Sequence, residues 1–309
     1  MATKGNLPTL LDLAAGMGDA QVALVDALTS DAGSAIYRVM PMRQVTGWAE
    51  QFTRKTGRPN VSFRDLGGGI TPGKMDRTPV REGIFLLSGA SEVDRIKADR
   101  DPRGTAAYRE EEDGAYLESM GHTLSFTTFY GSGAREFDGL LKRLPSGADT
   151  YVNAGAASET TSIYALKFGP GRFMGLYNVG PSGDIVEAFD YGAITEKDTD
   201  GDIQEIYRMT FNAGMGLGQY HPKAIGRIGR INASNKPTAK DFTELFGKMG
   251  WKPDVLVTTW TGAGYISELK QTALRMAPGE RNYDIEVDNY AGIPIIVDPA
   301  LSDAEDGVL

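Results

Sequence analysis

The sequence predicts an α+β protein, because strand-like and helix-like segments alternate along it. The most informative segment is a long hydrophilic stretch, 45–87, with the pattern of two strands joined by a glycine-rich tip. A long amphipathic helix is predicted over 101–129, and glycine-rich strand segments follow it. Because an isolated two-stranded hairpin is only marginally stable in water, we expect residues 45–87 to pack against another copy of the chain. The pattern indicates an assembly protein rather than a self-contained enzyme.

Composition places the chain in the ordinary globular class and excludes several kinds of site. The 309 residues carry a formal net charge of −9, 41% of them are hydrophobic and 39 are glycine. This acidic balance disfavours sequence-specific binding to duplex DNA, which needs clustered cations. The absence of cysteine excludes disulfides, thiolate catalysis and cysteine metal sites. Because the sequence shows neither a signal peptide nor a long apolar run, we expect a soluble chain.

The first segments are an N-terminal helical region, 1–44, and the hairpin. Asp19 is the expected N-cap of a helix over 20–28. In the hairpin, Val61 and Phe63 alternate with polar residues, the period-two pattern of a strand with one buried face. The hairpin is also rich in cations, which either form a solvated face or pair with acidic patches on a neighbouring subunit. These candidate intersubunit contacts are Arg54, Lys55, Arg58, Arg64, Lys74, Arg77 and Arg81.

The helix predicted over 101–129 has a defined start and a defined apolar face. Asp101 is the expected N-cap, and Pro102 takes the first helical position. The predicted buried stripe consists of Leu117, Met120 and Leu124, widened by Tyr116 and Ala107. Four consecutive acidic residues are expected to face solvent: Glu110, Glu111, Glu112 and Asp113.

The rest of the chain predicts a mixed sheet and two more helices. Strands are expected at 161–169, 173–180, 206–220 and 254–260, with a closing hairpin over 283–301. A helix over 237–250 is capped by Thr238 with Asp241 and closed by Gly250, and another helix is predicted over 264–276. The acidic residues 303–306 are expected to be solvated.

Motifs that would carry chemistry fail on inspection, so we predict no catalytic residue, no cofactor and no metal site. The run from Gly68 to Lys74 resembles a phosphate-binding loop, but Met75 replaces the required Ser or Thr and no helix follows. The acidic loop at Asp198 lacks the glutamate that a calcium-binding EF-hand needs at position twelve. The two histidines, His122 and His221, are expected to be structural. The run 214–218, with its alternating glycines, is interpreted as a bulge or turn.

Taken together, the segments resemble a known family over nearly the whole chain. The chain is similar to the major capsid proteins of short-tailed phages of the epsilon-fifteen type, which have the Hong Kong 97 capsid fold. The matching motifs are Glu92–Val93–Asp94, Glu118-x-Met120, Phe129–Tyr130–Gly131, Phe137-x-Gly139–Leu140, Thr161–Ser162–Ile163, Arg230–Ile231–Asn232 and Tyr290–Ala291–Gly292–Ile293–Pro294–Ile295.

The resemblance implies a domain organisation. Residues 1–44 are then the N-terminal arm and 45–90 the extended hairpin loop laid over an adjacent subunit. Residues 91–131 are the peripheral domain with its long spine helix, and 132–275 are the axial domain with a mixed sheet. Residues 276–309 return to the peripheral domain. Identical subunits then assemble as hexamers and pentamers into the icosahedral head shell of a tailed phage.

The resemblance also implies partners. These are other copies of the chain, a portal protein and packaged double-stranded DNA bound without sequence specificity, with a cement protein as an optional addition and no membrane. A separate scaffolding protein is expected, because only the 44 residues of the arm precede the hairpin. The family's Lys–Asn crosslinks are not carried over to Lys55 or Lys74. The chain is expected in the virion capsid after synthesis and assembly in the bacterial host cytoplasm. The alternatives are an encapsulin-like compartment shell and an enzyme, either a hydrolase or a nucleotide-using protein.

Overall fold

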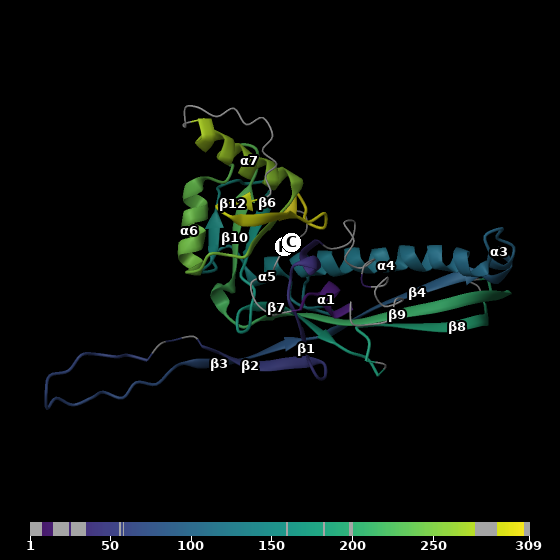
Figure 1. The fold of residues 1–309 in the computed structure, drawn as a ribbon, viewed down its shortest axis with the longest axis horizontal. Coiled ribbons are helices and arrows are strands. Elements are labelled where there is room, and N and C mark those ends of the chain that lie inside the picture. Colours follow the sequence, from purple (N-terminus) through teal and green to yellow (C-terminus); the bar gives the residue numbers. More distant parts are fainter. Residues whose placement is uncertain are drawn as a thin grey trace.

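The computed structural model describes residues 8–14, 25, 35–55, 57, 59–158, 160–181, 183–197, 200–275 and 289–305. The molecule is elongated, with the two-stranded hairpin at one end and a long helix beside long strands at the other (Figure 1). A second, compact sheet with its own helices lies beside the middle of the long axis. The helix expected over 20–28 lies outside the described residues, apart from Val25.

A five-stranded sheet is built around one long strand, β9 (Ile203–Gln219, 17 residues). On one side β9 pairs with β4 (Phe85–Asp94) in antiparallel register. On its other side β9 pairs first with β8 (Val186–Lys197) and then with β7 (Phe173–Asn178), and the short β1 (Met42–Gln44) extends β7 in parallel. Strands more than 100 residues apart in sequence therefore lie side by side.

Helix α4 (Thr105–Tyr130, 26 residues) packs on β4 through the predicted stripe. Leu117, Met120 and Leu124 are buried, which confirms the predicted face, whereas Tyr116 is 39% exposed and does not widen it. Residue Gly89 of β4 lies directly beneath the helix, since a Cβ there would be 3.2 Å from Sδ of Met120. This close approach positions α4 flat against the sheet.

The predicted start of this helix is wrong. A separate short helix, α3 (Arg95–Asp99), comes first and is capped by Asp94, which accepts a hydrogen bond from the backbone of Lys97 at 2.9 Å. Asp101 lies in the turn between the helices and accepts from the backbone of Arg103. The chain reverses through Gly104 at φ +97°, a conformation that favours glycine, so α4 begins only after it.

One of the four acidic residues that were expected to face solvent is partly buried instead. Asp113 is half-buried, is hydrogen-bonded to Ser91 of β4, and has a pKa raised by burial. Its neighbours Glu110, Glu111 and Glu112 are exposed, as predicted. The difference follows from helical spacing, because position 113 lies one turn before Leu117 and therefore on the same face of α4, which packs on β4.

The second sheet has six strands in the order β12-β13-β11-β6-β10-β5. Its central strands are almost fully buried, and helix α6 (Ala239–Met249) has the predicted capping box of Thr238 and Asp241 and ends at Gly250 in the left-handed conformation. Helix α7 (Trp260–Arg275) covers the sheet as well. The strands are β5 (Tyr151–Asn153), β6 (Thr161–Leu166), β10 (Ile225–Ile231), β11 (Val255–Thr258), β12 (Asn289–Tyr290) and β13 (Ile293–Val297).

A buried carboxylate joins the end of the six-stranded sheet to α4. Asp298, just after β13, accepts hydrogen bonds from Ser125 of α4 at 2.8 Å and from the backbone of Ile36 at 3.3 Å. Strands from the range 132–275 contribute to both sheets. The remaining elements are α1 (Leu10–Ala14), η1 (Ala35–Arg38), α5 (Leu140–Arg143) and η2 (Pro222–Ala224).

The hairpin consists of β2 (Ala49–Lys55) and β3 (Arg77–Gly83), paired in antiparallel register from Ala49↔Gly83 to Lys55↔Arg77. The described residues between 57 and 76 form no strand, so the prediction of strand structure around Val61 and Phe63 is wrong. A segment with alternating apolar residues forms a strand only where a sheet or a hydrophobic core packs against it. No described residue of the subunit covers this segment.

Candidate assembly interface

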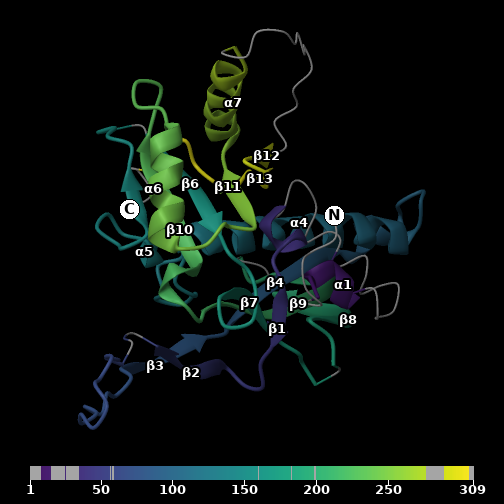
Figure 2. The same cartoon turned by 60° about the vertical axis from the view of Figure 1, so that its left-hand side comes forward.

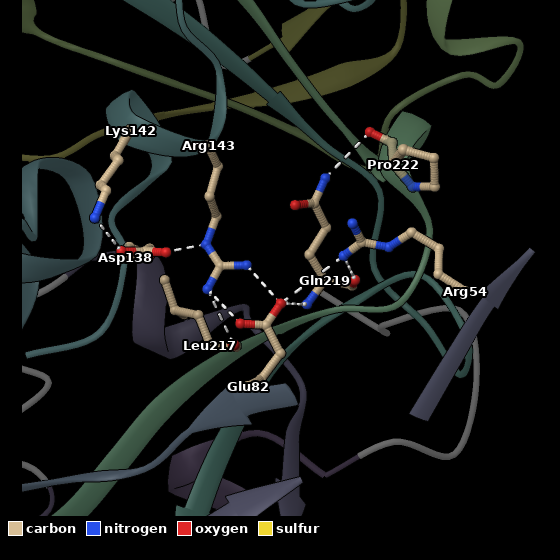
Figure 3. A network of polar contacts seen from close by, with 8 residues as sticks. All are labelled: Arg54, Glu82, Asp138, Lys142, Arg143, Leu217, Gln219 and Pro222. Atoms are coloured by element: carbon tan, nitrogen blue, oxygen red, sulfur yellow. Dashed lines mark hydrogen bonds and ion pairs between the residues drawn. The ribbon is translucent and has the colours of Figure 1, made fainter. Parts of the chain in front are cut away.

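The base of the hairpin is held by a buried ion pair (Figure 3). Glu82 of β3 is 9% exposed, and its carboxylate accepts two hydrogen bonds from Arg143 of α5. Both pairs, Nη1 to Oε1 and Nη2 to Oε2, measure 2.8 Å. Such a bidentate pair fixes direction as well as distance, so it sets the angle at which β3 leaves the body.

A second cation completes the hairpin base. Nη2 of Arg54 on β2 donates to the carbonyl oxygen of Gln219 and lies 3.9 Å from the carboxylate of Glu82. Burial lowers the pKa of Arg54. Because Arg54 contacts its own chain, its guanidinium is occupied within the subunit. On the same strand Phe52 packs against Tyr220 with ring centroids 4.5 Å apart.

The alternating glycines of β9 form the platform on which the hairpin base lies. A Cβ at Gly216 would be 2.6 Å from the carbonyl oxygen of Gly83, and a Cβ at Gly214 would be 3.6 Å from Ile84. The pairing of β9 with β4 and β7 continues through these positions without a register shift, so the interpretation of 214–218 as a bulge or turn is wrong. These glycines allow close approach of another backbone, a role that spacing alone did not reveal.

The tip of the hairpin exposes apolar side chains that a soluble subunit would normally bury. Val61 is 91% exposed, Phe63 107%, Leu66 108% and Ile70 74%. Burying one such side chain stabilises an interface by about 1.5–3 kcal/mol. Four of them on one projecting segment form an apolar surface that no described residue of the subunit covers.

The cations of the hairpin whose side chains are described divide into those bonded within their own subunit and those without a partner in the described structure. Arg64 donates to the carbonyl oxygen of Gly68 at 2.7 Å, within the tip. Lys74, Arg77 and Arg81 are exposed and have no ion pair or hydrogen-bond partner among the residues that the structure describes. The side chains of Lys55 and Arg58 lie outside the described residues.

Within the described residues, the motifs that could carry chemistry have no supporting geometry, and the start of the acidic loop at Asp198 lies outside those residues. The glycine-rich run before Lys74 lies in the exposed tip, and His122 is exposed on α4. His221 accepts a hydrogen bond from the backbone of Lys223 and lies edge-on to Trp251, and desolvation together with nearby cations lowers its pKa. Among the described residues no His, Asp and Glu side chains gather as a metal site, and no helix has the length and hydrophobicity that crossing a bilayer requires.

Two solved phage structures are similar to this chain over most of its length. The structure of bacteriophage Epsilon15 matches with a TM-score of 0.64 and 19% identity, covering 84% of this chain and 85% of that chain. The capsid of bacteriophage JBD30 decorated with minor capsid protein trimers matches with a TM-score of 0.50 and 11% identity, covering 87% and 91%. At these identities the similarity shows the fold alone, which is the expected mixed α+β fold of the Hong Kong 97 type.

An encapsulin is also similar, but more weakly. The encapsulin complex from Synechococcus elongatus PCC 7942 matches with a TM-score of 0.44 and 11% identity, covering 64% of this chain and 87% of that chain. This score is too low to support the compartment alternative. No curated protein matches the chain.

The family comparison is decisive. The family model described as major capsid protein GP7 matches residues 39–308, which include the hairpin, α4 and both sheets. This match agrees with the fold that the solved structures share. The chain therefore belongs to the major capsid protein GP7 family, and it is a structural, non-enzymatic subunit of the head shell of a tailed phage.

Proposed function

We propose that the β2–β3 hairpin is the extended loop by which each capsid subunit holds a neighbouring subunit. The observation that carries this proposal is the uncovered apolar tip of Val61, Phe63, Leu66 and Ile70 on a cationic hairpin. The anchored base supports it, because a bidentate Glu82–Arg143 pair holds the projecting strands at a fixed angle. The contact set consists of Arg64, Lys74, Arg77 and Arg81 with the apolar tip.

The domain roles follow from this proposal. Residues 1–44 act as the N-terminal arm and 45–90 as the extended loop. Residues 91–131, with α4 as the spine helix, form the peripheral domain, and 132–275 form the axial domain, whose loops meet at the symmetry axes. The segment 276–309 returns to the peripheral domain, which agrees with the contact of Asp298 with Ser125 of α4. Subunits arranged in this way assemble as hexamers and pentamers.

The proposed partners are a separate scaffolding protein, a portal protein and packaged double-stranded DNA. The net charge of −9 supports a shell that encloses DNA without binding it tightly. A cement protein is a further proposed partner, supported by the related JBD30 capsid, which is decorated with minor capsid protein trimers. Synthesis and assembly take place in the host cytoplasm.

Shortening the hairpin tests the proposal. Lys55 and Arg77 are directly paired, so an Asn-Gly turn can replace 56–76 and close a two-residue hairpin. This variant keeps Phe52, Arg54 and Glu82, which hold the base, and its subunit should fold with an unchanged melting midpoint. We expect it to form no stable shells in electron micrographs, under conditions in which the unmodified chain forms them.

Normal shells from the shortened chain would contradict the proposal. A matched control replaces Gly69 and Thr71, both in the exposed tip, with serine, which leaves the length and the apolar residues intact; a Cβ at Gly69 would meet nothing within 4 Å. The control should assemble like the unmodified chain.

A further inference from the structure

An apolar groove lies at one end of the six-stranded sheet, where α6 meets the turn between β12 and β13. Its volume is about 460 Å³, which is within the range of pockets that hold a bound group. Phe246 near the end of α6, Trp251 just after the helix and Ile293 at the start of β13 supply its apolar walls. Lys252 and Ala291 also line it. We call this site the α6 groove.

The walls of the α6 groove are fixed by contacts within the subunit. Cζ of Arg172 lies 4.9 Å from the centroid of the Trp251 ring, and His221 lies edge-on to the same ring at 4.6 Å. On the opposite wall, Nζ of Lys252 donates to the carbonyl oxygen of Ala291 at 2.8 Å. A groove whose walls are already held in place loses little conformational entropy when it receives a side chain.

The backbone of one wall residue is strained. Among the described residues thirteen glycines have positive φ, and the two other residues that do are Arg230 and Ala291, with φ +50° at Ala291. Glycine would adopt this conformation without strain, yet the methyl group of Ala291 is retained in the lining of the groove. Because residues in such conformations cluster at binding sites, the strain supports a binding role for the groove.

A group that fits the α6 groove lies at the other end of β11. Trp251 comes before this strand, and Trp260 follows it as the first residue of α7 (Figure 2). Trp260 is 79% exposed, and outside the hairpin tip no other large apolar side chain in the described part of the chain is as exposed. Tryptophan is enriched among the residues that dominate binding between proteins.

The charges beside the two surfaces are complementary. Asp303 accepts a hydrogen bond from Thr261, the neighbour of Trp260, at 2.8 Å, so a carboxylate lies next to the exposed ring. Lys252 is exposed at the groove. Neither Lys252 nor Asp303 has an ion-pair partner among the residues that the structure describes. An aromatic ring beside a carboxylate therefore matches an apolar groove beside an ammonium group.

The two surfaces belong to different parts of one subunit. Trp260 does not line the α6 groove of its own subunit, and the two lie at opposite ends of β11. A projecting group and a groove placed in this way give a head-to-tail contact, and head-to-tail contacts between identical chains generate closed rings when the rotation allows. Because the chain belongs to a family of major capsid proteins, further copies of it are its expected neighbours.

We propose that Trp260 of one subunit inserts into the α6 groove of a second copy of this chain, with Asp303 of the first copy paired to Lys252 of the second. This inference rests on the proposed function, because it specifies how the six-stranded sheets of neighbouring subunits contact one another within a hexamer or pentamer. The contact does not involve the hairpin.

A disulfide formed in assembled shells tests this contact. Because the chain has no cysteine, the double variant Lys252→Cys, Asp303→Cys carries only the two introduced thiols. After shells are verified by electron microscopy, mild oxidation should link neighbouring subunits, and a non-reducing denaturing gel should show a ladder that ends at five and six subunits. The matched control is Lys240→Cys, Asp303→Cys, whose first thiol lies at the exposed start of α6 and should give no ladder.

Charge exchange decides the question if the double-cysteine chain does not assemble. Lys252→Glu alone should lower the yield of shells measured by light scattering, and adding Asp303→Lys should restore it. A combined variant with no more shells than Lys252→Glu alone would overturn the proposal.

Closed shells of the double-cysteine chain that show no ladder would also overturn it. Both results leave the hairpin proposal standing, since the hairpin is intact in these chains. Normal shells from the shortened-hairpin chain would instead overturn the proposed function, so the two failures can be distinguished.

Discussion

At the scale of single residues, a buried charge holds the end of the chain. The sequence predicted a solvated acidic segment at 303–306, but Glu305 is only 1% exposed. Arg227 of β10 donates to its carboxylate at 2.8 Å, Ser162 donates at 2.5 Å, and the backbone N–H of Glu305 bonds to Thr160. Local composition cannot reveal such a contact, because its partners lie more than 70 residues away.

Glu305→Gln should destabilise the subunit by about 3–5 kcal/mol, because it leaves Arg227 buried without a countercharge. Denaturant unfolding of the unassembled subunit measures this loss. Asp303→Asn is the matched control, since that exposed carboxylate accepts a hydrogen bond from Thr261 at 2.8 Å and its replacement should cost less than about 1 kcal/mol. Equal unfolding midpoints for the two variants would contradict the role of Glu305 as the countercharge of Arg227.

At the scale of elements, local signals were sufficient only where local contacts decide the outcome. Helix α6 is capped by Thr238 and closed by Gly250 as predicted, because both devices act within one helix. The start of α4 was predicted too early, since α3 uses Asp94 as its cap and a turn follows. The hairpin tip was predicted as a strand, but no residue in the described part of the subunit pairs with its apolar pattern. An exposed apolar pattern of this kind in a single subunit indicates a surface that contacts another chain.

Two glycine substitutions separate close backbone packing from ordinary helix propensity. Gly216→Ala should cost about 1–3 kcal/mol and displace the hairpin, because its Cβ would be 2.6 Å from the carbonyl oxygen of Gly83. Gly114→Ala in α4 meets nothing within 4 Å and should stabilise the subunit by about 1 kcal/mol. Unfolding free energies and protease cleavage within 57–76 measure both effects. A Gly216→Ala subunit as stable and resistant as the unmodified chain would refute the platform role of β9.

At the scale of the whole molecule, the hairpin (49–83) carries seven cations and four carboxylates, whereas the whole chain has a net charge of −9. The strand-like segments and the family resemblance were readable from the sequence, but their division into two sheets was not. β4 pairs with β9, and β13 with β11, across long intervals that no local pattern specifies. The family resemblance supplied what local patterns could not, since it compared the order of all segments at once.

Reversing the charge of the hairpin should weaken assembly. The triple variant Lys74→Glu, Arg77→Glu, Arg81→Glu removes the cations that have no partner in the described subunit, so the yield of shells should fall and depend less on salt. The matched control, Lys97→Glu, Arg100→Glu, Lys240→Glu, carries the same net charge on exposed positions outside the hairpin. Light scattering measures the yield. Equal yields from both variants would show that net charge, and not the hairpin, controls assembly.

The central claim is that the hairpin tip becomes covered when subunits assemble. Hydrogen–deuterium exchange of residues 57–76, compared between unassembled subunits and closed shells, tests it most directly. In the unassembled subunit the described residues of this segment form no strand, so their backbone amides should exchange fast. The account predicts strong slowing of exchange over this segment in shells, with little change in the buried strands β6 and β10. Equally fast exchange of residues 57–76 in both states would contradict it.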